Sequence, residues 1–128
     1  MHPALEQVDW EKEGEAVVEL LRALLRFDTT NPPGDEAQAA SLVGARLEAA
    51  GFSVEAHEFD AGRVSLVARW GVSGDRPSLC LTGHLDTVPL GKADWSVDPF
   101  SGETDGDRLF GRGTSDMSEN FPHSHRES

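Results

Sequence analysis

The chain has 128 residues, of which 38% are hydrophobic, so we expect at most one modest domain with a core that is not rich. Eleven basic against 23 acidic residues give a formal net charge of -12, which argues against nucleic acids and anionic membranes as partners. The single cysteine, Cys80, rules out an intramolecular disulfide. No signal peptide or membrane-spanning run is visible, so a soluble, cytoplasmic protein is expected.

Two amphipathic helices are predicted in the first half of the chain. Over residues 10–27, apolar residues recur at spacings of three and four, and acidic residues are concentrated in the first turns, as the helix dipole favours. The Pro-Pro doublet at 32–33 cannot continue a helix, so residues 29–34 should form a loop. A second helix follows, with Asp35 as its N-cap and Gly51 as its left-handed C-terminal residue.

Two β-hairpins are predicted from alternating side chains and turn signals. Residues 52–57 and 64–70 alternate apolar and polar side chains on either side of a glycine-containing turn, which indicates an antiparallel pair. Ser101–Thr104 and Arg108–Phe110 are expected to pair across Asp105-Gly106, because this dipeptide favours a tight turn.

The apolar run Ser78-Leu79-Cys80-Leu81 predicts a buried strand that ends near His84 and Asp86. Residues i and i+2 of an extended backbone point the same way, so these two side chains are expected to lie side by side. A carboxylate that accepts the proton of one imidazole nitrogen leaves the other nitrogen for a metal. His84 is therefore a candidate metal ligand and Asp86 its orienting partner. The alternative is an ordinary strand-end histidine followed by a turn aspartate.

Leu109–Met117 repeats this arrangement, because a short strand and a glycine-rich turn precede Asp116, where a helix should begin. The glycines at 111 and 113 could suggest a phosphate-binding turn, but the third glycine of that fingerprint is missing and the Asp116 carboxylate would repel phosphate. A Ser-His-Asp hydrolase built from Ser115, His84 and Asp86 is a runner-up that lacks the usual glycine pattern around its serine. The overall order of helices and strands predicts an α/β layer with a mixed sheet.

Four segments together resemble a known family. They are FDTTNPPG at 27–34, LTGHLDTVP at 81–89, WSVDPFSGE at 95–103 and GDRLFGRGTSDM at 106–117. In this order and at this spacing they resemble the zinc-dependent hydrolases that include acetylornithine deacetylase, succinyl-diaminopimelate desuccinylase, aminoacylase and glutamate carboxypeptidase. The resemblance extends over roughly residues 13–117.

The resemblance implies an N-terminal part of a zinc-exopeptidase-like, three-layer α/β/α catalytic domain with a mixed sheet, which would be incomplete. It implies that His84 ligates one metal, that Asp116 bridges two, and that Asp86 is the family's catalytic aspartate and holds His84. Two zinc ions, with cobalt or manganese as substitutes, would polarise the amide carbonyl of an N-acyl amino acid or peptide and activate a water. It also implies a cis peptide at Asp116-Met117.

Residues 118–128 depart from the family's pattern, which continues with a lysine and glycines that open a long helix. Their polar composition and Pro122 do not suit that helix, so we expect residues 1–117 to be a portion of the hydrolase domain and 118–128 an aberrant tail. The resemblance implies that an adjacent glutamate pair supplies the general base, and residues 1–128 hold no such pair. We also expect the family's dimerisation domain to be absent. We expect a truncated, inactive hydrolase of marginal stability, or alternatively a non-enzymatic, degenerate or interacting product.

Overall fold

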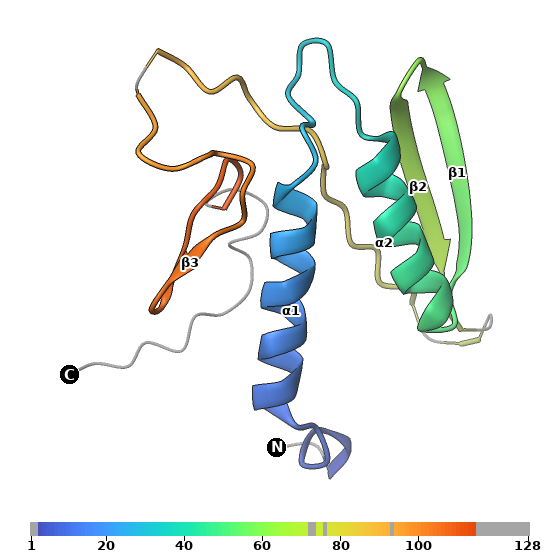
Figure 1. Cartoon of the computed structure of the whole chain (residues 1–128). Coiled ribbons are helices and arrows are strands. Elements are labelled where there is room, and N and C mark those ends of the chain that lie inside the picture. Colours follow the sequence, from blue (N-terminus) through green and yellow to red (C-terminus); the bar gives the residue numbers. More distant parts are fainter. Residues whose placement is uncertain (1–2, 72–73, 76, 93, 115–128) are drawn as a thin grey trace.

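The computed structural model describes residues 3–71, 74–75, 77–92 and 94–114 of the chain. A short 3-10 helix at Pro3–Leu5 is followed by α1 (Trp10–Leu25), α2 (Ala37–Ala49), β1 (Ser53–Asp60), β2 (Arg63–Arg69), β3 (Thr104–Asp105) and β4 (Arg108–Leu109). Figure 1 shows α1 in the middle, with α2 and the β1–β2 hairpin on one side and β3 on the other. The predicted α/β class is confirmed.

Helix α1 forms where the spacing of its leucines predicted it. Its first turn is capped by Asp9, whose Oδ1 accepts a hydrogen bond of 3.1 Å from the Lys12 backbone N–H. Glu11 and Glu13 lie in that turn, where the helix dipole favours negative charge. Its last residue, Leu25, is buried, so the C-terminal end of α1 is the part that is anchored in the molecule.

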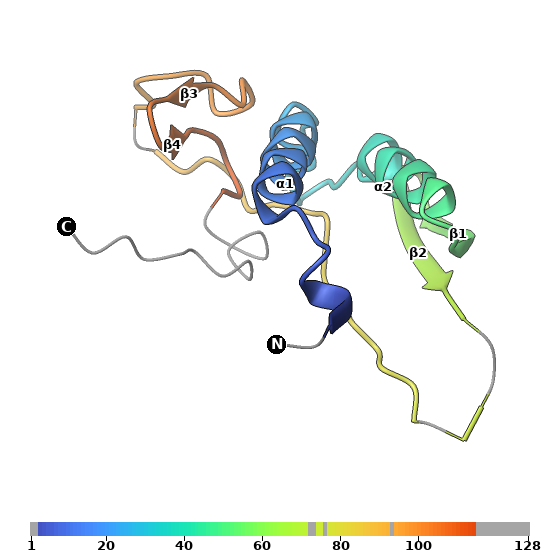
Figure 2. The ribbon, with the colours of Figure 1, turned by 90° about the horizontal axis from the view of Figure 1, so that it is seen from below.

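Helix α2 packs on the β1–β2 hairpin, as Figure 2 shows from below. Ala39 and Ala40 are buried, and a Cβ on Gly44 would lie 3.7 Å from Val54 Cγ1, so small residues bring the helix close to the strands. The predicted Asp35 cap is wrong, because Glu36 occupies the N-cap position and its side chain makes no capping bond. The Gly62 carbonyl instead accepts the backbone N–H groups of Glu36 and Ala37, at 2.9 and 3.1 Å.

Both predicted hairpins form, with altered lengths. Strands β1 and β2 pair antiparallel from Ser53–Arg69 to Asp60–Arg63, so β1 extends beyond its predicted end at residue 57. Strands β3 and β4 pair only Thr104 with Leu109 and Asp105 with Arg108, so they are shorter than the predicted strands at 101–104 and 108–110.

The predicted buried strand at residues 78–81 is wrong. The segment belongs to no helix or strand, and it forms no β-pairing with any residue that the structure describes. Leu79 and Leu81 are 84% and 85% exposed, and Cys80 is exposed as well. A strand persists only where its backbone N–H and C=O groups find a neighbouring chain, and β1 and β2 pair with each other instead. In place of one mixed sheet there are two separate hairpins and, within the described ranges, a single parallel bridge between Thr30 and Thr87.

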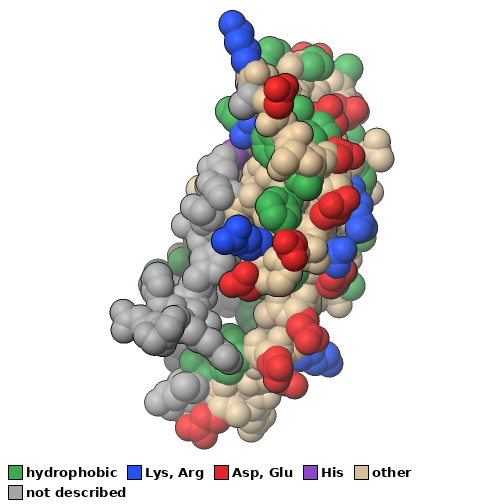
Figure 3. Space-filling model, turned by 60° about the vertical axis from the view of Figure 1, so that its left-hand side comes forward, with side chains coloured by type: hydrophobic (Ala, Val, Ile, Leu, Met, Phe, Trp, Pro, Cys, Tyr) green, Lys and Arg blue, Asp and Glu red, His purple; other side chains and the backbone are tan. Residues whose placement is uncertain are grey.

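The surface combines acidic and hydrophobic side chains. Figure 3 shows both kinds interspersed on one face, in keeping with the net charge of -12. Three large aromatic side chains, those of Trp10, Phe59 and Trp70, are 60–74% exposed. Within the described part of the chain, no helix is both long enough and apolar enough to cross a membrane.

Candidate functional site

The loop after α1 is bound to the segment that follows His84. The Asn31 backbone N–H donates to Thr87 O at 2.8 Å, and the Thr87 N–H donates to Thr29 O at 3.1 Å. The buried Thr29 hydroxyl donates to Leu85 O at 2.8 Å. These three bonds fix the backbone of residues 85–87 against the loop, although the two segments are more than 50 residues apart in the sequence.

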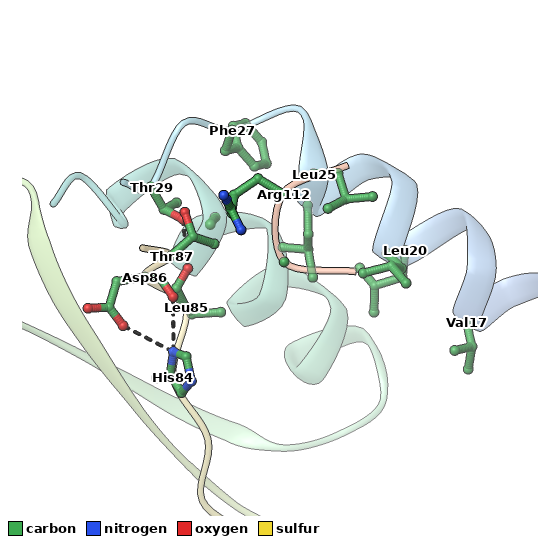
Figure 4. A pocket seen from close by; sticks show the side chains of 14 residues that line it. Val17, Leu20, Leu25, Phe27, Thr29, His84, Leu85, Asp86, Thr87 and Arg112 are labelled. Atoms are coloured by element: carbon green, nitrogen blue, oxygen red, sulfur yellow. Dashed lines mark hydrogen bonds and ion pairs between the residues drawn. The ribbon is translucent and has the colours of Figure 1, made fainter. Parts of the chain in front are cut away.

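The side chains of His84 and Asp86 lie side by side next to this loop (Figure 4). The Nδ1 atom of His84 is 2.9 Å from the Asp86 backbone oxygen and 3.1 Å from Asp86 Oδ1. Both neighbours can only accept hydrogen bonds, the carboxylate being ionised, so Nδ1 carries the proton. In the neutral imidazole, Nε2 then keeps the lone pair with which a histidine binds a metal.

The second carboxylate oxygen of Asp86 contacts two side chains. Asn31 Nδ2 donates to Oδ2 at 2.8 Å, and Arg63 Nη2 lies 3.8 Å from the same oxygen. The hydrogen bond from Asn31 is the main cause that holds the pKa of Asp86 below its usual value, against the opposing effect of burial, and His84 and Arg63 lower this pKa further. Asp86 is therefore a carboxylate at neutral pH and accepts from both sides.

Arg63 is itself held by a buried carboxylate. Its Nε donates to Glu36 Oε2 at 2.9 Å, and the Glu36 side chain is only 6% exposed. Gly34 makes room for this pair, because a Cβ at that position would lie 2.7 Å from Arg63 Nε, and the backbone there has a φ of +80°. The glycine that ends the loop thus allows Arg63 to reach both carboxylates.

Two cavities adjoin the His84–Asp86 pair. One, of about 260 Å³, is largely apolar; it extends from His84 and Arg112 to the leucines of α1, which Figure 4 shows on the far side from His84. The other, of about 290 Å³, is lined by Asn31, His84, Asp86, Thr87 and Val88. The pair thus borders two hollows, of which the first is largely apolar.

The other predicted site residues lie outside the described residues. This applies to Asp116, the expected second metal ligand, to Ser115 of the alternative hydrolase, and to the Asp116-Met117 peptide. Among the residues that the structure does describe, no three metal-ligating side chains form a cluster. Of the predicted ligands, the structure describes only His84, and this residue fits a metal site. Its Nδ1 is hydrogen-bonded to Asp86, which orients the imidazole so that Nε2 can be the ligand atom.

Sequence reasoning missed three residues around Asp86. Asn31, Arg63 and Glu36 carried no assigned role, although Asn31 belongs to one of the four quoted segments. A polar residue next to the loop prolines was the available signal for Asn31. Nothing in the local pattern around Arg63 or Glu36 indicates that they meet.

Comparison with known proteins agrees with these features. Residues 80–120 match the sequence profile of Peptidase family M20/M25/M40. The chain belongs to this family. The matched region includes His84 and Asp86, and the resemblance inferred from the four segments is confirmed.

Among the relatives of this M20 chain are proteins with two different names. Succinyl-diaminopimelate desuccinylase from Dinoroseobacter shibae is 43% identical over 101 residues, which are 78% of this chain and 26% of that protein. The protein of the same name from Xanthobacter autotrophicus is also 43% identical, over 77% of this chain and 26% of its own length. Aminoacylase-1 from Sus scrofa is 37% identical over 83% of this chain and 27% of its own length. The chain therefore spans about a quarter of the relatives it matches.

Proposed function

We propose that this M20 chain contributes to a metal-dependent hydrolase of amide or peptide bonds, with His84 as a metal ligand and Asp86 as the residue that orients it. The single observation that supports this most is the double hydrogen bond from His84 Nδ1 to the backbone and side chain of Asp86. An imidazole bonded in this way has a fixed tautomer and a fixed ring plane.

Asp86, His84 and Asp116 have different roles in this proposal. Asp86 keeps the proton on His84 Nδ1, so that Nε2 is the ligand atom. His84 and Asp116 would hold the metal, as the family resemblance implies. When bound, zinc would supply a Lewis acid for the amide carbonyl and for the attacking water.

Zinc, a cytoplasmic location and an N-acyl amino acid or peptide as substrate are parts of this proposal. Two of the relatives cited above are named desuccinylase and the third is named aminoacylase. These names support an acylated amino acid as the substrate class. A catalytic zinc takes about three protein ligands, so the chain by itself should bind metal more weakly than a complete site would.

Titration with Co²⁺, followed by its visible absorption, tests the metal site. We expect binding that is lost in His84→Ala and kept in His57→Ala, because His57 is exposed on β1 and lies 3.5 Å from Glu55, away from Asp86. Equal binding by both variants would contradict the proposal. The non-enzymatic interpretation would then be favoured.

Turnover tests the activity. The purified chain is incubated with zinc and either N-succinyl or N-acetyl amino acids, and amine release is measured. Hydrolysis that disappears in His84→Ala but not in His57→Ala would establish that the chain itself is a hydrolase. Zinc-dependent hydrolysis that persists in His84→Ala would overturn the role given to His84.

A further inference from the structure

We propose that Asn31 is a positioning residue for this site: its side-chain amide holds the Asp86 carboxylate in the rotation that presents Oδ1 to His84. The inference rests on the proposed function, because it assigns a task to Asn31 within the same metal site. Neither the family match nor the names of the relatives specify this task.

The two oxygens of Asp86 have separate partners. Oδ1 lies 3.1 Å from His84 Nδ1, and Oδ2 accepts from Asn31 Nδ2 at 2.8 Å. Turning the carboxylate about its bond to Cβ would break both contacts together. A hydrogen bond to one oxygen therefore fixes the direction of the other.

An amide is suited to this position. Asn31 Nδ2 is a donor, whereas an aspartate of the same shape would present only acceptors to Asp86 at neutral pH and would repel it. Arg63 also faces Oδ2, but at 3.8 Å it adds charge rather than a directed hydrogen bond. Its reach is limited by its bond to the buried Glu36.

The backbone holds Asn31 in place independently of its side chain. Its N–H donates to Thr87 O, the Thr87 N–H donates to Thr29 O, and the Gly34 N–H closes the loop by donating to Thr30 O at 2.9 Å. Removal of the amide should leave all of these bonds intact. The positioning role is thus separable from the folding of the loop.

Asn31 lines the same hollow of about 290 Å³ as His84 and Asp86. The competing interpretation is that its side chain only ties the loop to residues 85–87. That interpretation predicts a loss of stability, with no specific effect on His84 beyond what any loosened loop would cause.

The test compares Asn31→Ala and Asn31→Asp with the unchanged 128-residue chain. In the metal-free chain, we expect the NMR signal of the His84 Nδ1 proton to broaden through faster exchange with water in both variants, while the backbone amide spectrum stays that of the parent. Co²⁺ affinity should fall roughly tenfold, the lower end of what loss of an outer-shell partner costs.

Asp28→Ala is the matched control, because it removes another side-chain hydrogen bond of the same loop, from the Thr30 N–H to Asp28 Oδ1, without touching Asp86. It should leave both readings unchanged. Parent-like readings in the Asn31 variants, or equal losses in Asp28→Ala, would overturn the inference. If Co²⁺ binding proves independent of His84, the proposed function fails on its own, and the Nδ1 proton signal still decides the role of Asn31.

Discussion

Replacing Arg63 with methionine is expected to lower the free energy of unfolding by about 2–4 kcal/mol, because it leaves the buried Glu36 carboxylate without its cationic partner. Glu36 is 6% exposed in its side chain, and Arg63 Nε lies 2.9 Å from its Oε2. Within the described residues, Glu36 Oε1 has no hydrogen-bond partner to compensate. Breaking a fully buried pair costs about 3–5 kcal/mol, and the 23% exposure of Arg63 reduces this.

A second arginine on β2 supplies the control. Arg69 Nη1 lies 2.6 Å from Glu55 Oε1, a shorter contact than that of Arg63, but the two side chains are 63% and 52% exposed. Exposed pairs contribute about 0–1 kcal/mol, so Arg69→Met should change stability little. The comparison separates the effect of burial from that of distance.

Urea unfolding followed by tryptophan fluorescence measures all variants. Adding Glu36→Gln to Arg63→Met should restore much of the lost stability, because the unpaired buried charge is then removed. The reasoning is refuted if Arg69→Met costs as much as Arg63→Met, or if the double variant is no more stable than Arg63→Met alone.

Three further outcomes are expected. Gly102→Ala should destabilise more than Gly106→Ala in thermal melts, since both have a positive φ but only a Cβ at Gly102 would meet backbone, at 2.9 Å from Arg22 O; equal shifts would contradict this. Leu81→Lys should reduce light scattering by aggregates without changing circular dichroism, because the side chain is 85% exposed, and altered dichroism would count against that exposure. The exposed Cys80 thiol should react with a disulfide reagent as fast in the native chain as in urea, and native-state protection would be the contrary result.

The parts of the fold that depend on neighbours in sequence were predictable. The leucine spacing of α1 and the alternation in β1 and β2 express the period of the backbone itself, so their positions follow from local pattern. The adjacency of His84 and Asp86 follows in the same way, because residues i and i+2 share a face in extended chain.

The parts of the fold that depend on residues distant in the sequence were not predictable. The run at 78–81 has the composition of a buried strand, but composition does not tell which chain will pair with it, and no described residue does. Asn31 meets Asp86 across 55 positions, and Glu36 meets Arg63 across 27. Contacts of this kind depend on the path of the intervening chain, which no local motif encodes.

The bonds between residues 29–31 and 85–87 close a loop that contains α2, β1 and β2. Closing a flexible loop of about 55 residues costs on the order of 3.5 kcal/mol in chain entropy before constant terms. Any ligand that selects the arrangement in which Asn31 holds Asp86 therefore also selects the closed loop, and its affinity is thermodynamically linked to the folding of α2 and its hairpin. Mild denaturant should therefore lower the affinity for such a ligand by opening this loop, even where the surroundings of His84 are unchanged.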